Sequence, residues 1–102
     1  MARLGDMVTK VRSKNAGPFW LTIDIFCGSD LAFRSVSNGL QTSAVAALLS
    51  TPQDRVKRFD IADLNVIKIS VPRPQPQGTL RDRDMHGAAT AAIVADMQIG
   101  GS

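Results

Sequence analysis

The sequence predicts a small α+β domain in which helices cover one face of a β-sheet. Segments rich in aromatic and β-branched residues, typical of strands, alternate with segments whose apolar residues recur at helical spacing. Turn-forming residues separate them, for example "SKNAGP" before the first strand and Pro52 after the first helix. At 102 residues the chain is long enough for one core, so we expect a single domain over residues 1–102.

The first predicted strand and the first predicted helix have the clearest patterns. "FWLTIDIFC", residues 19–27, combines aromatic and β-branched residues and predicts a strand. In "LQTSAVAALLS", residues 40–50, Leu40, Ala44 and Leu48 recur at helical spacing and predict a helix. Thr42 or Ser43 could cap its start.

Two further strands and a second helix follow. "RVKRFDIA" (residues 55–62) and "NVIKISV" (residues 65–71) predict two short strands, and "DMHGAATAAIVADM" (residues 84–97) predicts a helix. A weak last strand could follow near residues 98–100. The order β-α-β-β-α is that of a ferredoxin-like split β-α-β sandwich whose final strand is weak or absent.

This arrangement makes the first and third predicted strands antiparallel neighbours, and alternation assigns their side chains to two faces. Leu21, Ile23 and Ile25 should meet the helices. The other face would carry aromatic side chains, and Asp24 could pair with Lys68 across the strands. A helix-free face with aromatic residues is a candidate protein interface, although the same residues could simply be partly exposed. The candidate interface residues are Trp20, Thr22, Phe26 and Lys68.

The same pairing places the polar segments at residues 12–18 and 72–87 at one edge of the sheet. The second helix begins at that edge, where its dipole and free N–H groups favour a carboxylate or phosphate. The basic residues that could gather there are Arg12, Lys14, Arg73, Arg81 and Arg83. In the alternative interpretation Asp82 or Asp84 caps the helix and the arginines lie in solvent.

The motif "DRDMHG" supplies the candidates for proton transfer. His86 could act as an acid or base with Asp84 nearby, or it could be structural. Asp82, Asp84 and His86 include oxygen and nitrogen donors suited to a divalent metal. Their alternate spacing faces one side only in an extended segment, whereas this segment enters a helix, so we assign no metal site. The cofactor stays unassigned.

Composition excludes several classes of function. The lone Cys27 excludes an internal disulfide and a cysteine-based metal cluster. No apolar run is long enough to span a membrane and no signal peptide is evident, so we expect a cytoplasmic protein without membrane contact. The sequence contains no P-loop and no dinucleotide fingerprint. The net charge is only +3 and the third strand lacks base-stacking aromatic residues, so no nucleic acid is expected.

At "RSKNAGPFWLTIDIF" and "ISVPRPQPQGTLRDRDMHGA" the sequence resembles a bacterial family known as domain of unknown function 4387. The resemblance covers nearly the whole chain. It implies a ferredoxin-like domain related to the C-terminal domain of AtuA-type acyclic terpene utilisation proteins. It also implies a partner, since such small proteins are commonly encoded beside an AtuA-like large protein. The chain would then be the small subunit of a two-component enzyme, a hydratase or other carbon–oxygen lyase, on carboxylic acids or acyl-CoA thioesters.

The family resemblance carries no established catalytic assignment, so the roles come from the side-chain chemistry. Lys14, Arg73 and Arg81 would bind the substrate carboxylate, Asn15 would supply a hydrogen bond, and His86 with Asp84 would transfer protons. The alternative is a non-catalytic module that binds a partner or self-associates into a homo-oligomer. The family's two signature blocks correspond here to Ser13, Lys14, Asn15, Gly17 and Pro18, then Pro72, Arg73, Pro74, Gln77, Gly78, Asp82, Asp84, His86 and Gly87.

Overall fold

The computed structural model describes residues 2–73 and 89–99 and confirms the predicted α+β class. Within these residues, the main sheet has four antiparallel strands in the order β2-β3-β5-β4. The central pair, β3 (Trp20–Phe26) and β5 (Val66–Pro72), is flanked by β2 (Lys10–Asn15) and β4 (Lys57–Ile61). The predicted antiparallel contact between the segments now assigned to β3 and β5 is therefore confirmed.

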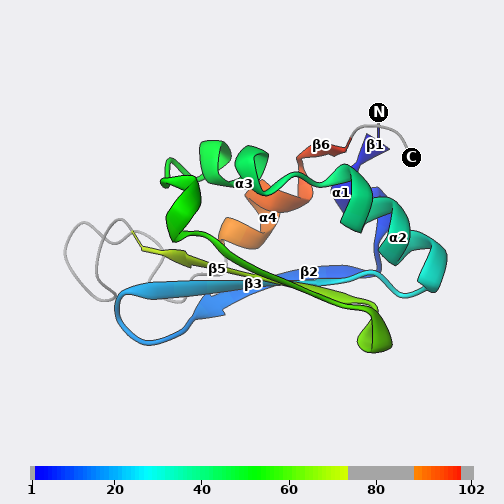
Figure 1. Ribbon diagram of the computed structural model, residues 1–102, viewed down its shortest axis with the longest axis horizontal. Helices are drawn as coiled ribbons and strands as arrows, with labels where there is room; N and C mark the ends of the chain where they lie inside the picture. The colour runs from blue at the N-terminus through cyan, green and yellow to red at the C-terminus, as the bar shows by residue number, and fades with distance from the viewer. Residues whose placement is uncertain (1, 74–88, 100–102) are drawn as a thin grey trace.

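The α-helices lie on one side of this sheet, as Figure 1 shows. They are α1 (Leu4–Met7), α2 (Asp30–Gly39), α3 (Thr42–Leu48) and α4 (Ala89–Ala95). Short 3-10 turns, η1 (Gln53–Arg55) and η2 (Ala62–Leu64), flank β4. In a separate pair, β1 (Ala2–Arg3) lies antiparallel to β6 (Gln98–Ile99). In the part of the chain that the structure describes, no helix has the length and apolar character needed to cross a membrane.

The core lies between the sheet and the helices. Ile23, Ile25 and Ile67 have no exposed surface, which confirms the face predicted to meet the helices. Val36 of α2 and Val94 of α4 are equally buried in the same cluster. Every second residue of the two central strands therefore contributes to the core, and the hydrophobic effect holds the helices on that face.

Helix α2 and strand β2 were not predicted from the sequence, and neither were the short elements β1 and α1. Helix α2 begins after Ser29, whose Oγ accepts a hydrogen bond from the backbone N–H of Ala32 at 3.1 Å. The side chains of Phe33 and Val36, on the inner face of this helix, are buried. Strand β2 carries a single aliphatic residue, Val11, so its own pattern is too weak to predict a strand. Backbone hydrogen bonds to β3 stabilise this segment as a strand, although its own sequence has no strand pattern.

The structure also differs from the prediction in the cap of α3 and in the position of the last strand. Helix α3 starts after Gln41 and has no side-chain cap, so the predicted caps at Thr42 and Ser43 are wrong. The final strand β6 forms, but it pairs with β1 outside the main sheet. The position next to β3 belongs instead to β2, which precedes β3 in the chain. Residues 84–88 of the second predicted helix lie outside the described residues.

An ion pair with further hydrogen bonds ties β4 to α2. Arg58 Nε donates to Asp60 Oδ1 at 2.8 Å, and its Nη2 donates to the carbonyl of Ser37 at 3.0 Å. The Ser37 hydroxyl donates to Asp60 Oδ2 at 2.5 Å, and Arg58 also contacts the Leu40 carbonyl. Desolvation by burial raises the pKa of Asp60, but the hydrogen bonds from Arg58 and Ser37 outweigh it and lower that pKa overall.

This network makes the stability of the fold sensitive to acid. We expect Asp60→Asn to cost about 1–3 kcal/mol of unfolding free energy near neutral pH, because Arg58 loses its charged acceptor. The pKa of Asp60 is lower in the folded than in the unfolded chain. The contribution is therefore fully present above about pH 4 and is lost as the pH falls through the folded pKa.

Urea unfolding of the wild type and Asp60→Asn at several pH values measures this difference. The stability gap should narrow as the pH falls below about 4. Asp54→Asn, an exposed aspartate of η1, is the matched control and should behave as the wild type does. A gap that is independent of pH would contradict the assignment.

Candidate functional site

A groove of about 500 Å³ opens at the end of the sheet where β3 begins and β5 ends. Trp20 and Pro72 are register partners there, and the N–H of Arg73 donates to the Phe19 carbonyl at 2.8 Å. The segment that joins α3 to β4 also contributes to the lining. The lining residues are Phe19, Trp20, Ser50, Thr51, Pro52, Arg55, Pro72 and Arg73.

Local hydrogen bonds position the wall that follows α3. Ser50 adopts a left-handed conformation with φ of 53°, which turns the chain away from the helix. The Thr51 N–H then donates to the Ala46 carbonyl at 2.9 Å, and the Thr51 hydroxyl donates to the Leu49 carbonyl at 3.2 Å. These bonds fix the approach to η1, which brings Arg55 to the groove.

The groove combines positive charge with apolar surface. Arg55 and Arg73 both line it, and none of the described residues that line it is an aspartate. Phe19, which is 58% exposed, and Trp20 supply aromatic surface. Guanidinium groups bind carboxylates and phosphates through paired N–H donors. The lining therefore suits a ligand with an anionic group on an apolar body.

Asn15 and Arg73, two of the predicted site residues, lie together. The Asn15 side-chain oxygen accepts a hydrogen bond from the Arg73 guanidinium. Ser13 lies two residues before Asn15, on the same face of β2. Its hydroxyl accepts a hydrogen bond from the backbone N–H of Ala91 in α4 at 2.8 Å. The end of β5, strand β2 and the first turn of α4 therefore meet at one edge, as the predicted strand pairing requires.

Lys14 lies on the opposite face of β2 from Asn15. Side-chain exposure alternates along this strand, and Lys14 is exposed beside its register partner Thr22. The structure thus corrects the expectation that Lys14 and Asn15 face one ligand together, because successive residues of a strand point to opposite sides. Arg12 also points to the face that carries Lys14.

The other predicted residues of the polar edge belong to the segment after Arg73. His86, Asp84 and Arg81 lie outside the described residues, as do Asp82 and Arg83. Within residues 2–73 and 89–99, no three His, Cys or acidic side chains lie close enough together to hold a metal ion. Cys27 is buried, and burial raises the pKa of its thiol, with a smaller contribution from Asp60. A raised pKa disfavours the nucleophilic thiolate.

The predicted interface residues share one face of the sheet, because they occupy the alternate, less buried positions of β3 and β5. The α-helices lie on the other side of the sheet (Figure 1). Trp20, Thr22 and Phe26 are half-buried and Lys68 is exposed. The Lys68 Nζ lies 3.9 Å from Asp24 Oδ1, which confirms the predicted cross-strand ion pair. We call this surface the open face; it is formed by the outward side chains of β2, β3, β5 and β4.

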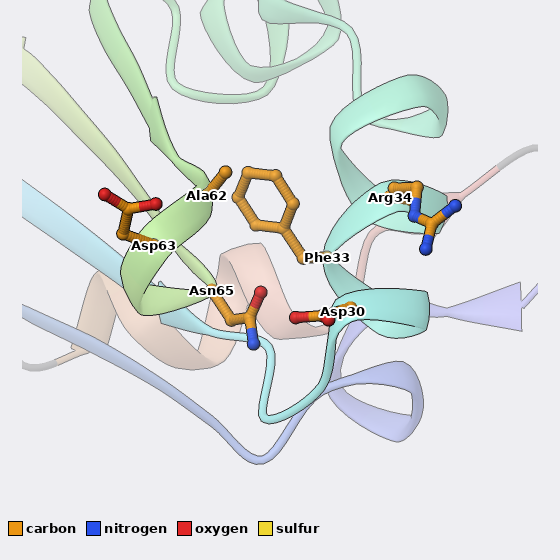
Figure 2. Close-up of a pocket in the computed structure, with 6 residues that line it drawn as sticks. All are labelled: Asp30, Phe33, Arg34, Ala62, Asp63 and Asn65. Atoms are coloured by element: carbon orange, nitrogen blue, oxygen red, sulfur yellow. The ribbon is translucent and has the colours of Figure 1, made fainter.

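A second hollow, of about 480 Å³, lies at the opposite end of the β3–β5 pair. Figure 2 shows Asp30 and Asn65 directed toward each other, while Arg34 and Asp63 point away from them. Phe33 lies between α2 and η2. Because this lining mixes both signs of charge, it presents no concentrated charge to a ligand. The groove with Arg55 and Arg73 is therefore the better candidate site.

Comparison with known proteins identifies the family. The family described as Domain of unknown function (DUF4387) matches residues 4–98, which include β2, β3, β5 and the groove residues. The chain belongs to the DUF4387 family. No curated protein and no solved structure matches it.

Three features of this DUF4387 groove were missed from the sequence: Phe19, Arg55 and the segment 50–52. Arg55 stands at the start of a predicted strand, where a basic residue carries no special signal. Its proximity to the β5 end follows from the antiparallel pairing of β4 with β5 and from the turn after α3. Only Pro52, a marker of chain reversal, offered a local hint.

The Asn15–Arg73 contact leads to a prediction about coupling. Because the two side chains share a hydrogen bond, Asn15→Ala and Arg73→Ala should have non-additive effects on unfolding free energy, by about 0.5–1.5 kcal/mol. Urea unfolding of the two single variants and the double variant measures the coupling. The matched cycle of Asn15→Ala with Arg34→Ala, on α2, should be additive; additivity in both cycles would contradict a specific contact.

Proposed function

We propose that the chain is the small subunit of a two-component enzyme and that its groove binds the anionic part of the substrate. The observation that supports this most strongly is the placement of Arg55 and Arg73 in one groove with aromatic neighbours. Two guanidinium groups provide more donors than one carboxylate needs, and the aromatic surface suits an attached apolar chain. A carboxylic acid or an acyl-CoA thioester has this combination of groups.

The proposed reaction is that of a hydratase or other carbon–oxygen lyase. In the dehydration direction a base removes a proton from the carbon next to the carbonyl group, and the hydroxyl group leaves as water after protonation. Negative charge develops on the carbonyl oxygens, and cationic groups beside them lower the barrier. Arg55 and Arg73 would supply that stabilisation, while His86 and Asp84 are the candidates for proton transfer.

The proposed partner is an AtuA-like large subunit in the cytoplasm, which the family resemblance suggests. The open face would dock on it through Trp20, Thr22, Phe26 and Lys68. We further propose that the sheet is ferredoxin-like, with β2 taking the edge place of the usual last strand beside β3. The order β2-β3-β5-β4 supports this relation, because both central strands and the far edge keep their expected order.

The alternative is a non-catalytic module that stabilises a partner or self-associates. The hydrogen bond between Asn15 and Arg73 favours it, because that bond ties Arg73 to the scaffold and a structural arginine needs no ligand. The two functions differ in whether Arg55 and Arg73 act on a bound anion. Ligand binding and assembly must therefore be measured separately.

Ligand binding tests the groove directly. Isothermal titration of the chain with acetyl-CoA, and separately with succinate, should show saturable binding. Arg55→Gln should weaken it about tenfold, since a charge-assisted bond is lost. Arg34→Gln, an equal charge change on α2, should leave it unaltered. Equal affinities of both variants, or no binding to the wild type, would contradict the proposed groove.

Purification from the native source tests the partnership. The chain should elute with a larger companion, and recovery only as a free monomer would contradict a two-component enzyme. In the reconstituted complex, Arg73→Ala and His86→Ala should each lower activity at least about tenfold while assembly persists. Full activity of both variants in an intact complex would reject direct catalysis and leave the non-catalytic module.

A further inference from the structure

A row of three basic residues runs along the open side of β2. All of its outward positions, Lys10, Arg12 and Lys14, are basic and exposed. In a strand, alternate residues lie about 7 Å apart on the same face. Their register partners on β3 are Phe26, Asp24 and Thr22. The row is therefore continuous with the aromatic and polar residues at the middle of the open face.

The positive charge continues across the rest of the open face. Lys68 of β5 and Lys57 of β4 project on the same side, because they share cross-strand register with Asp24 and Ser70. Within the described strands the face thus carries five cations, and its acid is Asp24. The cations are Lys10, Arg12, Lys14, Lys57 and Lys68.

Asp24 cannot offset this excess of charge. Its side chain is 18% exposed and already lies 3.9 Å from Lys68 Nζ. Its Oδ1 is buried and accepts no hydrogen bond from the residues that the structure describes. A hollow of about 240 Å³ beside it is also lined by Arg12, Ser13, Lys14 and Phe26. The β2 side of the open face therefore presents mainly cations around a recess.

Apolar side chains of β3 and β4 lie on the same face. Phe59 of β4 is 56% exposed, and Ile61 and Phe26 are half-buried. Aromatic residues and arginine are enriched in protein interfaces, where they surround or fill a desolvated centre. The face thus combines a cationic row with an apolar area, so one partner could make both charged and hydrophobic contacts.

We propose that the open face binds an acidic protein surface, whose carboxylates pair with the row Lys10, Arg12 and Lys14 and whose apolar side chains pack on Phe26 and Phe59. This proposal names the chemistry of the larger subunit's contact surface and so rests on the two-component function proposed above. Complementary charge at the rim of such an interface chiefly accelerates association and fixes orientation.

The structure favours an acidic protein over two other occupants. A single-stranded nucleic acid needs aromatic platforms, but the central strand β5 presents Lys68 and Ser70 on this face, and one side of the Trp20 ring is taken by Lys57 Nζ at 5.3 Å. A second copy of the chain would oppose cations to cations, and repulsion between them disfavours a symmetric contact.

Charge reversal on the full chain tests the proposal. The probe is fluorescently labelled poly-L-glutamate, with oligothymidylate as the competing polyanion, and anisotropy measures both. Lys14→Glu should weaken poly-glutamate binding about fivefold, since one ion pair becomes a repulsion. Arg34→Glu, the same charge change on α2, should weaken it less than about twofold. Amide NMR shifts induced by poly-glutamate should concentrate on β2 and β5.

Each other outcome overturns the proposal. If Lys14→Glu and Arg34→Glu lost the same affinity for poly-glutamate, only the net charge of the chain would matter. If the wild type bound oligothymidylate more tightly than poly-glutamate, the open face would be a nucleic-acid surface. A wild-type homodimer that Lys14→Glu dissociates, detected by analytical ultracentrifugation, would assign the face to a second copy. Lys14→Glu should keep its affinity for acetyl-CoA, so failure at this face is distinguishable from failure of the groove.

Discussion

The antiparallel contact between β3 and β5 is the interaction on which the rest of the molecule depends. Its register joins Trp20 to Pro72 at one end and Phe26 to Val66 at the other. Seven residues of each strand pair without a break, and alternate side chains from both form the floor of the core. This pairing fixes where β3 begins and β5 ends, and therefore where the groove with Arg73 can form.

The same pairing separates the two proposed roles of the chain. The groove lies at the strand ends, whereas the docking surface lies on the face that no described helix covers (Figure 1). Alternation along β2 divides its polar residues between them, with Asn15 bound to Arg73 and Lys14 on the open face. Trp20 belongs to both surfaces, but Arg55 lines the groove and Lys14 lies on the open face, so substitutions of Arg55 and of Lys14 should have separable effects.

The strongly patterned parts of the fold could be predicted from sequence. The two central strands were found because their alternating apolar side chains form the core. Helix α3 was found from its helical spacing, although Ala44 and Leu48 of that pattern are exposed and its buried residues are Val45 and Ala46. Helix α2 was missed although Ser29, Phe33 and Val36 carry a cap and a buried face. Of the candidate site, the meeting of Asn15 with Arg73 was foreseen from strand pairing, while Arg55 and Phe19 were not.

The sequence by itself determined the α+β class, the apolar face of the central strands and the motifs that identify the DUF4387 family. The class and the apolar face follow from the local spacing of apolar residues, because the face on which a side chain lies depends on its position in a strand or helix. The tertiary structure decided which strand lies beside β3 and which residues line the groove together with Arg73. Strand β2 is almost wholly polar, so no pattern of its own could place it. Backbone hydrogen bonds to β3 and contacts from α4 place it at that edge.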